Sequence, residues 1–246
     1  MKKLMALLAL LIMASCVLAA GDKDKDKDKK NSSSKVVDSG SFGVFMDGKR
    51  IATEKFRIEQ GADIGIINSE IKVDDGNNKA EQSAEMQVAN NGELRLYKWR
   101  STVPTHEETI VEPKENFLIE HLTTADQKKR DVPYILPLTT VILDDFFFSH
   151  RELLVWRYLA SGCLRKDDQL ACGASHFGIL VPRQHLAANT VVELLGREKI
   201  TLKSGEKEFN KIKLDADGTT WLFWVDDDYK VVKIAIPSNK VEVLRD

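Results

Sequence analysis

The sequence predicts a mainly β protein, a strongly curved antiparallel sheet (a half-barrel or open barrel) wrapped around one buried helix. From Ser41 onward, apolar and polar residues alternate over most of the chain, which is the period of half-buried strands. One segment, about 145–160, breaks this alternation and is apolar nearly all round, as a buried helix is. An antiparallel sheet needs one covered face, and this helix is the element available to cover it.

The first half of this domain is predicted to be a series of hairpins. SFGVFMDGKRIATEKFRIEQ is typical of two strands joined at an Asp47-Gly48 turn. The next strand, DIGIINSEIKVDD, places Ile67 and Ile71 on one face, and alternation is cleanest over 79–88. Further strands are expected at 107–112, 117–122 and 132–139, with prolines marking turns or edge positions.

The segment TTVILDDFFFSHRELLVWRYLASGC carries the predicted helix. Asp144 or Asp145 is a natural N-cap, and Gly162 is expected to close the helix as a C-cap. Strands resume at HFGILVP and continue through NTVVELLGREKITLKSG into a C-terminal meander with turns at Asp217-Gly218, 226–229 and 237–239.

The N-terminus predicts export. Lys2 and Lys3 precede an apolar stretch, 4–13, that is too short to span a bilayer and is typical of a secretory signal. The residues that follow it, Met13-Ala14-Ser15-Cys16, resemble a bacterial lipobox, with Met13 where Leu is preferred. This resemblance implies a signal peptide over 1–15 and a lipid anchor on Cys16. Cleavage by the ordinary signal peptidase, near Ala19, is the alternative and would give a soluble periplasmic or secreted protein.

The expected location is therefore the bacterial cell envelope, with the protein anchored by acyl chains and facing the periplasm. Val17 rather than Asp follows Cys16, which favours the outer membrane in the enterobacterial sorting rule. Residues 16–40, the lipidated Cys and a charged stretch, are predicted to form a flexible tether, because 22–40 have almost no apolar content and end in Ser and Gly. A single β-rich domain is expected over 41–246.

Three cysteines occur in the chain, and Cys16 is either acylated or removed. The remaining pair, Cys163 and Cys172, is predicted to form a disulfide in an oxidising compartment. Two free buried thiols are the alternative. Zinc binding with His176 and His185 is disfavoured, because the spacing lacks the tight cysteine pair of structural zinc sites.

Charge and motifs exclude several function classes. The formal net charge is −2, which argues against a nucleic-acid partner. No P-loop, dinucleotide fingerprint or zinc-protease motif occurs, and no cofactor or metal is expected. A hydrolase would have to use Ser149 with His150, or Asp144 with Asp145. Adjacent helix residues do not face each other, so we expect no catalytic residue and interpret the protein as non-enzymatic.

Three stretches, DGKRIATEKFRI, ILDDFFFSHRELL and GEKEFNKIKLDADGTTWLFWVDDDYKVVKIAIP, resemble uncharacterised bacterial periplasmic β proteins. These proteins are similar in architecture to the lipoprotein-carrier half-barrels, which hold acyl chains between a curved sheet and a helical lid. The resemblance covers most of 41–245 and carries no ligand-binding residue over to this chain.

The leading functional hypothesis is binding of a hydrophobic ligand, or chaperoning of a lipidated or apolar partner, in the periplasm. The candidate pocket residues are Phe146, Phe147 and Phe148, the densest aromatic run in the chain, with Trp156 expected to be core. Plain core packing of these phenylalanines is the alternative interpretation. The other functions considered are an assembly lipoprotein that binds an envelope protein through a sheet edge, and a hydrolase.

Overall fold

The computed structural model describes residues 34–166, 169–202 and 205–246. These residues belong to one compact unit. The predicted signal peptide, Cys16 and the first part of the predicted tether lie outside the described residues. No helix in the described ranges is long and apolar enough to cross a bilayer.

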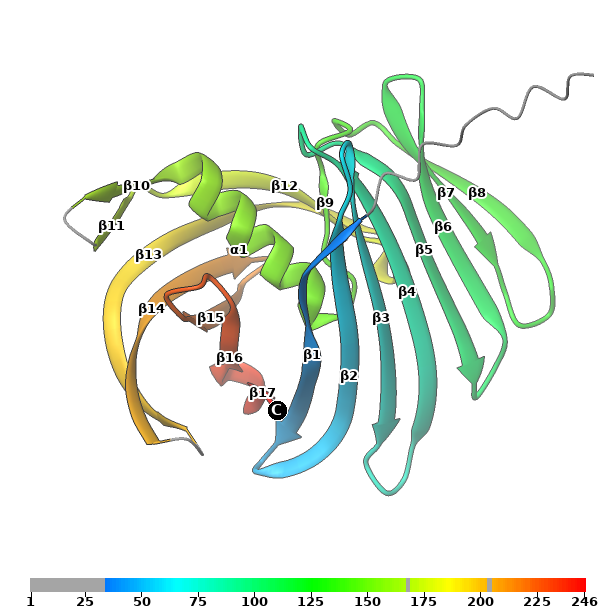
Figure 1. The fold of residues 1–246 in the computed structure, drawn as a ribbon. Coiled ribbons are helices and arrows are strands. Elements are labelled where there is room, and N and C mark those ends of the chain that lie inside the picture. Colours follow the sequence, from blue (N-terminus) through cyan, green and yellow to red (C-terminus); the bar gives the residue numbers. More distant parts are fainter. Residues whose placement is uncertain (1–33, 167–168, 203–204) are drawn as a thin grey trace, which may run out of the picture. The chain divides into compact units, whose positions relative to one another are not determined.

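A single large sheet dominates the described part of the chain (Figure 1). Its first eight strands run in chain order: β1 (Lys35–Met46), β2 (Lys49–Gln60), β3 (Ile64–Asp74), β4 (Lys79–Ala89), β5 (Leu94–Val103), β6 (Glu107–Lys114), β7 (Phe117–Thr123) and β8 (Lys129–Tyr134). The remaining seven are β9 (Val141–Ile142), β12 (Ser175–Val181), β13 (Leu186–Leu202), β14 (Gly205–Ala216), β15 (Thr219–Val225), β16 (Val231–Ile236) and β17 (Val241–Arg245).

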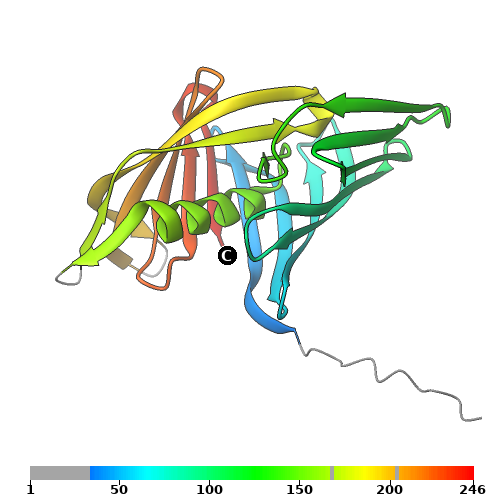
Figure 2. The same cartoon turned by 90° about the horizontal axis from the view of Figure 1, so that it is seen from above.

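The sheet consists of two wings, one formed by β1 to β8 and the other by β9 and β12 to β17. The pairing of β1 with β17 joins them. The strand order is β8-β7-β6-β5-β4-β3-β2-β1-β17-β16-β15-β14-β13-β12-β9, and every pairing is antiparallel except β9 with β12. Both wings curl toward the same side, and helix α1 (Phe148–Gly162) lies in the concavity (Figures 1 and 2). The predicted curved, open antiparallel sheet around one helix is confirmed.

Alternation along the strands builds the core on this concave face. On β3, for example, Ile67, Ser69 and Ile71 are buried and point inward, whereas Asn68 and Glu70 are exposed. Tight turns follow the expected chemistry: both residues of Asp47-Gly48 and of Asp217-Gly218 have positive φ, as a two-residue hairpin turn requires.

The edge strands β8 and β9 do not pair with each other, but hydrogen bonds connect the two wings near these edges. Leu94 at the start of β5 donates its N–H to the carbonyl of Leu138, in the segment between β8 and β9. On β7, the buried carboxylate of Glu120 accepts a hydrogen bond from Tyr134, and its Oε2 lies 3.0 Å from Nδ1 of His185. His185 follows the short helix η1 (Pro182–Gln184), which comes after β12 in the other wing. Side chains therefore connect the two wings at a point where no strands pair.

The predicted helix boundaries are wrong at both ends. Residues 145–147 are not helical: Phe146 has φ +67, and Phe147 occupies the N-cap position without a side-chain cap. Asp144 does not cap, because its carboxylate accepts hydrogen bonds from Arg183 and Tyr97. Gly162 is the last residue of the helix, and the next residue, Cys163, has an extended backbone. Gly162 is therefore not a left-handed C-cap.

Two strand predictions also differ from the structure. β1 begins at Lys35, inside the stretch expected to be tether, because Val36 and Asp38 pair with β2. The strand expected at 132–139 ends at Tyr134, and the two-residue β9 follows later. A second, separate sheet is the hairpin of β10 (Cys163–Lys166) and β11 (Gln169–Cys172), which follows α1 directly.

Candidate functional site

Helix α1 combines a buried polar first turn with an apolar second half. Four consecutive polar side chains, Ser149 to Glu152, are buried, although the surrounding segment is strongly apolar. Buried polar groups are costly unless they are hydrogen-bonded, so the partners of each define what this end of the helix can do.

Glu54 on β2 caps the helix from across the core. Its Oε2 accepts the N–H of Phe148 at 2.7 Å, and its Oε1 accepts the hydroxyl of Ser149 at 2.7 Å. The Ser149 hydroxyl also lies 2.7 Å from that of Ser69 on β3. Complete burial raises the pKa of Glu54 to about 7, against the opposing effect of these hydrogen bonds.

Ser149 and His150 do not form a nucleophile–base pair. The Ser149 hydroxyl is engaged by Glu54 and Ser69, as above. Both ring nitrogens of His150 lack a hydrogen-bond partner among the described residues, and the ring lies between Tyr97 and Phe147. Burial lowers the pKa of His150 to about 3, so the ring is neutral at ordinary pH.

Asp144 and Asp145 do not act as a carboxylate pair. Asp144 is fully buried and is paired with Arg183, whose Nε lies 2.8 Å from Oδ1. Asp145 accepts a hydrogen bond from Gln184 instead. The geometry of Asp144 is that of a structural ion pair that ties η1 to the start of the helix.

A second buried ion cluster holds the middle of the helix against the junction of the wings. Arg245 on β17 lies 2.9 Å from the carboxylate of Glu152 and 2.7 Å from that of Asp38 on β1. Lys230 adds a contact of 3.0 Å to Asp38. Burial raises the pKa of Glu152 well above its ordinary value, whereas hydrogen bonds to Arg245 and Lys230 outweigh the effect of burial and lower the pKa of Asp38.

Beside the second half of the helix lies an apolar cavity of about 550 Å³. Its walls come from α1, the β10–β11 hairpin, the start of β1, the end of β2 and the β15–β16 turn. The lining residues are Val37, Gln60, Trp156, Leu159, Ala160, Cys163, Arg165, Leu170, Asp228, Tyr229 and Lys230. The indole N–H of Trp156 donates to the carbonyl of Tyr229 at 2.7 Å, so the polar edge of that ring is satisfied and its apolar surface is available to the cavity.

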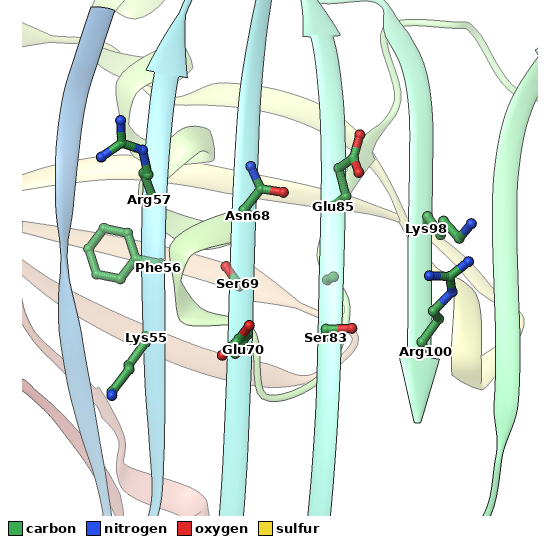
Figure 3. A pocket seen from close by; sticks show the side chains of 11 residues that line it. Lys55, Phe56, Arg57, Asn68, Ser69, Glu70, Ser83, Glu85, Lys98 and Arg100 are labelled. Atoms are coloured by element: carbon green, nitrogen blue, oxygen red, sulfur yellow. The ribbon is translucent and has the colours of Figure 1, made fainter. Parts of the chain in front are cut away.

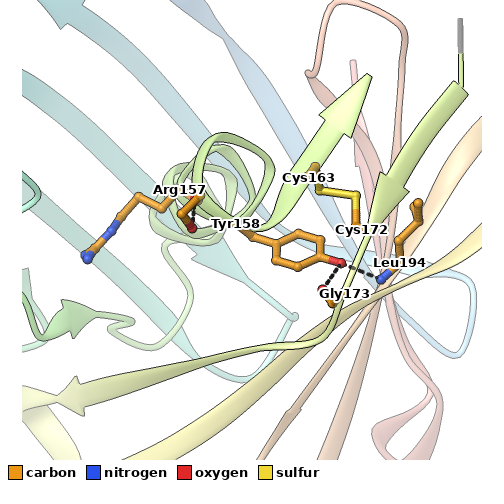
Figure 4. Close-up of a disulfide and its surroundings, with 7 residues drawn as sticks. Arg157, Tyr158, Cys163, Cys172, Gly173 and Leu194 are labelled. Atoms are coloured by element: carbon orange, nitrogen blue, oxygen red, sulfur yellow. Dashed lines mark hydrogen bonds between the residues drawn. A yellow bond between two sulfur atoms is a disulfide. The ribbon is translucent and has the colours of Figure 1, made fainter. Parts of the chain in front are cut away.

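The hairpin wall of this cavity is fixed at its base. Cys163 and Cys172 form the predicted disulfide and face each other across β10 and β11. The hydroxyl of Tyr158 donates to the carbonyl of Gly173 at 3.0 Å and accepts the N–H of Leu194 at 2.8 Å (Figure 4). These bonds tie the hairpin, the helix and β13 together at one point.

The predicted pocket residues lie elsewhere. Phe147 and Phe148 are buried core residues beside the first turn of the helix, and Phe146 is 46% exposed just before it. Trp156, which we expected to be core, is half-buried and lines the cavity. The aromatic run marked where the helix enters the core, whereas the cavity lies about two turns further along.

A shallower hollow of about 350 Å³ lies on the convex face, over β2 to β5 (Figure 3). Four basic residues line it, Lys55, Arg57, Lys98 and Arg100, together with Glu70 and Glu85. Arg57 is paired with Glu59, and both Lys98 and Arg100 contact Glu108. Most of this positive charge is therefore already balanced by neighbouring carboxylates.

Comparison with known proteins gives no family. No protein-family model matches the chain, and no curated protein matches its sequence. Among solved structures the chain is similar to a beta-barrel-like protein of the domain of unknown function DUF1849 from Brucella abortus. The TM-score is 0.48 and the identity 7%, over 84% of this chain and 93% of that one.

Proposed function

We propose that this protein binds a hydrophobic ligand, an acyl chain or a molecule that carries one, in the cavity beside the second half of α1. The observation that carries the proposal is the cavity itself. Its volume of about 550 Å³ lies within the roughly 300–1,000 Å³ of ligand pockets, and apolar side chains of Trp156, Leu159 and Leu170 line it.

The distribution of polar groups favours an amphiphile. Gln60, Asp228 and Lys230 also line the cavity, and Asp228 is exposed. An acyl chain would lie against the helix and the hairpin, with its polar end toward these side chains. The cavity is open to solvent, so a ligand can enter it, and its volume favours ligand binding over a purely structural role.

The proposal includes attachment to the cell envelope through an acylated Cys16. Strand β1 begins at Lys35, and Val37 of this strand lines the cavity. About twenty residues of chain separate Cys16 from Val37. An anchor on Cys16 would therefore hold the cavity close to a membrane, which supplies apolar ligands. Permanent attachment would need the two or three acyl chains of bacterial lipoproteins, since one chain binds only reversibly.

Uptake of the neutral dye N-phenyl-1-naphthylamine by the purified mature protein tests ligand binding. Ala160→Trp introduces a large side chain at a position that lines the cavity, and Ser161→Trp places the same side chain on the exposed neighbouring position, outside the lining. We expect Ala160→Trp to weaken dye binding at least tenfold and Ser161→Trp to leave it unchanged. Equal binding by both variants would contradict the proposal and would favour an assembly role through a sheet edge instead.

A further inference from the structure

A third cavity, of about 210 Å³, lies on the other side of α1 from the apolar cavity described above. It is partly open and is lined by residues of the first turn of the helix, of η1 and of β12 to β15. The walls include Leu143, Ile179, Leu186, Leu214 and Trp221, and one buried cation, Arg151.

Arg151 is only 4% exposed, yet its hydrogen bonds use one nitrogen. Nη1 donates to the carbonyls of Asp144 at 2.7 Å and Phe147 at 3.0 Å. Within the described ranges, Nε and Nη2 donate to no protein atom. In the described part of the chain, the fully buried side-chain atoms that lack a hydrogen-bond partner belong to Glu120, Thr140 and His150. Nε and Nη2 of Arg151 are not among them, so these two donors are in part accessible, and we place them at the cavity that Arg151 lines.

The charge of Arg151 is also without a direct ion-pair partner in the described part of the chain. Asp144 is paired with Arg183, and Asp145 is hydrogen-bonded to Gln184. Cζ of Arg151 lies 4.3 Å from the ring centroid of Trp221, a cation–π contact that uses none of the N–H donors.

The geometry points to a second ligand site in which Arg151 binds the carboxylate of a small monocarboxylic acid. Guanidinium groups bind carboxylates through paired, charge-assisted hydrogen bonds. Apolar residues make up about half of the wall, among them Ile179, Leu214 and Trp221, and this part suits a short hydrocarbon tail. Asp145 and Asp217 also line the cavity and repel negative charge in proportion to its amount, so they favour a ligand with one carboxylate over ligands with two or more.

The size of the cavity limits the ligand. Its volume of about 210 Å³ is below the roughly 300–1,000 Å³ of pockets for drug-sized ligands, so the ligand must be smaller than these. Butanoate fits this limit, and 1-butanol has a similar size without the charge. The pair therefore separates recognition by Arg151 from simple filling of an apolar space.

Saturation-transfer NMR titrations of the full mature protein with butanoate and 1-butanol test the site. Arg151→Met removes the guanidinium and keeps much of the apolar stem. Ala216→Leu fills part of the cavity from β14 and leaves the Arg151 side chain unchanged, so it tests the site even where Arg151→Met fails to fold. Ala187→Leu is the matched control, because Ala187 is exposed on β13 and does not line the cavity.

We expect saturable binding of butanoate, no saturable binding of 1-butanol, and at least tenfold weaker butanoate binding in Ala216→Leu and in folded Arg151→Met. Ala187→Leu should bind butanoate as the unmodified protein does. Equal binding of butanoate and 1-butanol would overturn the role of Arg151. Absence of saturable butanoate binding, or unchanged binding in Ala216→Leu, would overturn the site.

Discussion

The carboxylate of Glu54, at the middle of β2, accepts the backbone N–H of Phe148, the first residue of α1, at 2.7 Å. A strand residue 94 positions away in sequence therefore caps the helix, a role usually taken by the residue just before it. This hydrogen bond and the one that Oε1 of Glu54 accepts from the Ser149 hydroxyl tie the helix to the concave face of the sheet. One side chain of the sheet thus holds the first turn of the helix in place.

This arrangement predicts a pH-dependent stability that depends on Glu54. Burial raises the pKa of Glu54 from its ordinary value of 4.5 to about 7, so the folded protein holds this proton more tightly than the unfolded chain. The contribution to stability is fully present below pH 4.5 and is lost as the pH rises through about 7. At about 1.4 kcal/mol per pKa unit, the loss is on the order of 3 kcal/mol.

Urea unfolding of the wild-type protein and of Glu54→Gln, at pH 5 and pH 8, measures this contribution. We expect the variant to lose less stability than the wild type over this interval, by up to about 3 kcal/mol. Glu70→Gln, on the exposed face of β3, is the control and should behave as the wild type. The same pH dependence in wild type and Glu54→Gln would show that Glu54 does not titrate as described.

The cluster around Arg245 predicts a large cost for removing one cation. Arg245→Met leaves the buried carboxylates of Glu152 and Asp38 without their main partner and should destabilise the protein by about 3–5 kcal/mol. Adding Glu152→Gln should recover part of this loss, because a neutral amide is less costly to bury. Thermal and urea unfolding measure both effects, with exposed Arg57→Met as a control that should change stability little. A loss of less than about 1 kcal/mol in Arg245→Met would contradict the account of this cluster.

The disulfide is expected to stabilise the β10–β11 hairpin. Replacing both Cys163 and Cys172 by Ala should cost roughly 2–3 kcal/mol, the loop-closure estimate for about ten residues. Chemical unfolding measures the cost, and non-reducing peptide mapping tests the bond. Two thiols that react with an alkylating reagent in the native protein would refute it.

Phe147 and Trp156 should respond differently to truncation. Phe147 is fully buried, so Phe147→Ala should cost about 3–5 kcal/mol and leave dye uptake unchanged. Trp156 borders the cavity and makes fewer packed contacts, so Trp156→Ala should cost less and weaken dye uptake. Unfolding and dye titrations on the two variants measure both quantities. The reverse pattern would place the ligand beside the aromatic run at the helix start, as the sequence alone indicated.

The predicted lipid anchor has its own test. Cys16→Ser should abolish labelling by a palmitate analogue and release the protein from the membrane fraction. Unchanged fractionation of the variant would exclude the anchor.

The sequence predicted the sheet because period-two alternation depends on local residues. The sequence predicted the helix because apolar and polar residues do not alternate in SHRELLVWRYL, so this segment cannot be a strand with one apolar and one polar face. The cap was missed because it comes from 94 residues away. A signal was nevertheless present: Glu54 falls in register with Ala52, Phe56 and Ile58 on the apolar face of its strand, where a charged residue needs a buried partner.

The position of the cavity could not be predicted from the sequence for a different reason. A cavity is space left between elements, and here it lies where α1, the hairpin and the β15–β16 turn meet. Trp156 and Phe147 look equally apolar in the sequence. Their difference in packing depends on the curvature of the sheet, which the alternation of residues does not encode.

The most direct test of the central claim is native mass spectrometry of the protein purified from its own cell envelope in mild detergent. We expect a discrete added mass of a lipid or fatty acid on the wild-type protein and on Ser161→Trp, and its loss from Ala160→Trp. A protein free of added mass, or the same added mass on Ala160→Trp, would contradict binding of an apolar ligand in this cavity.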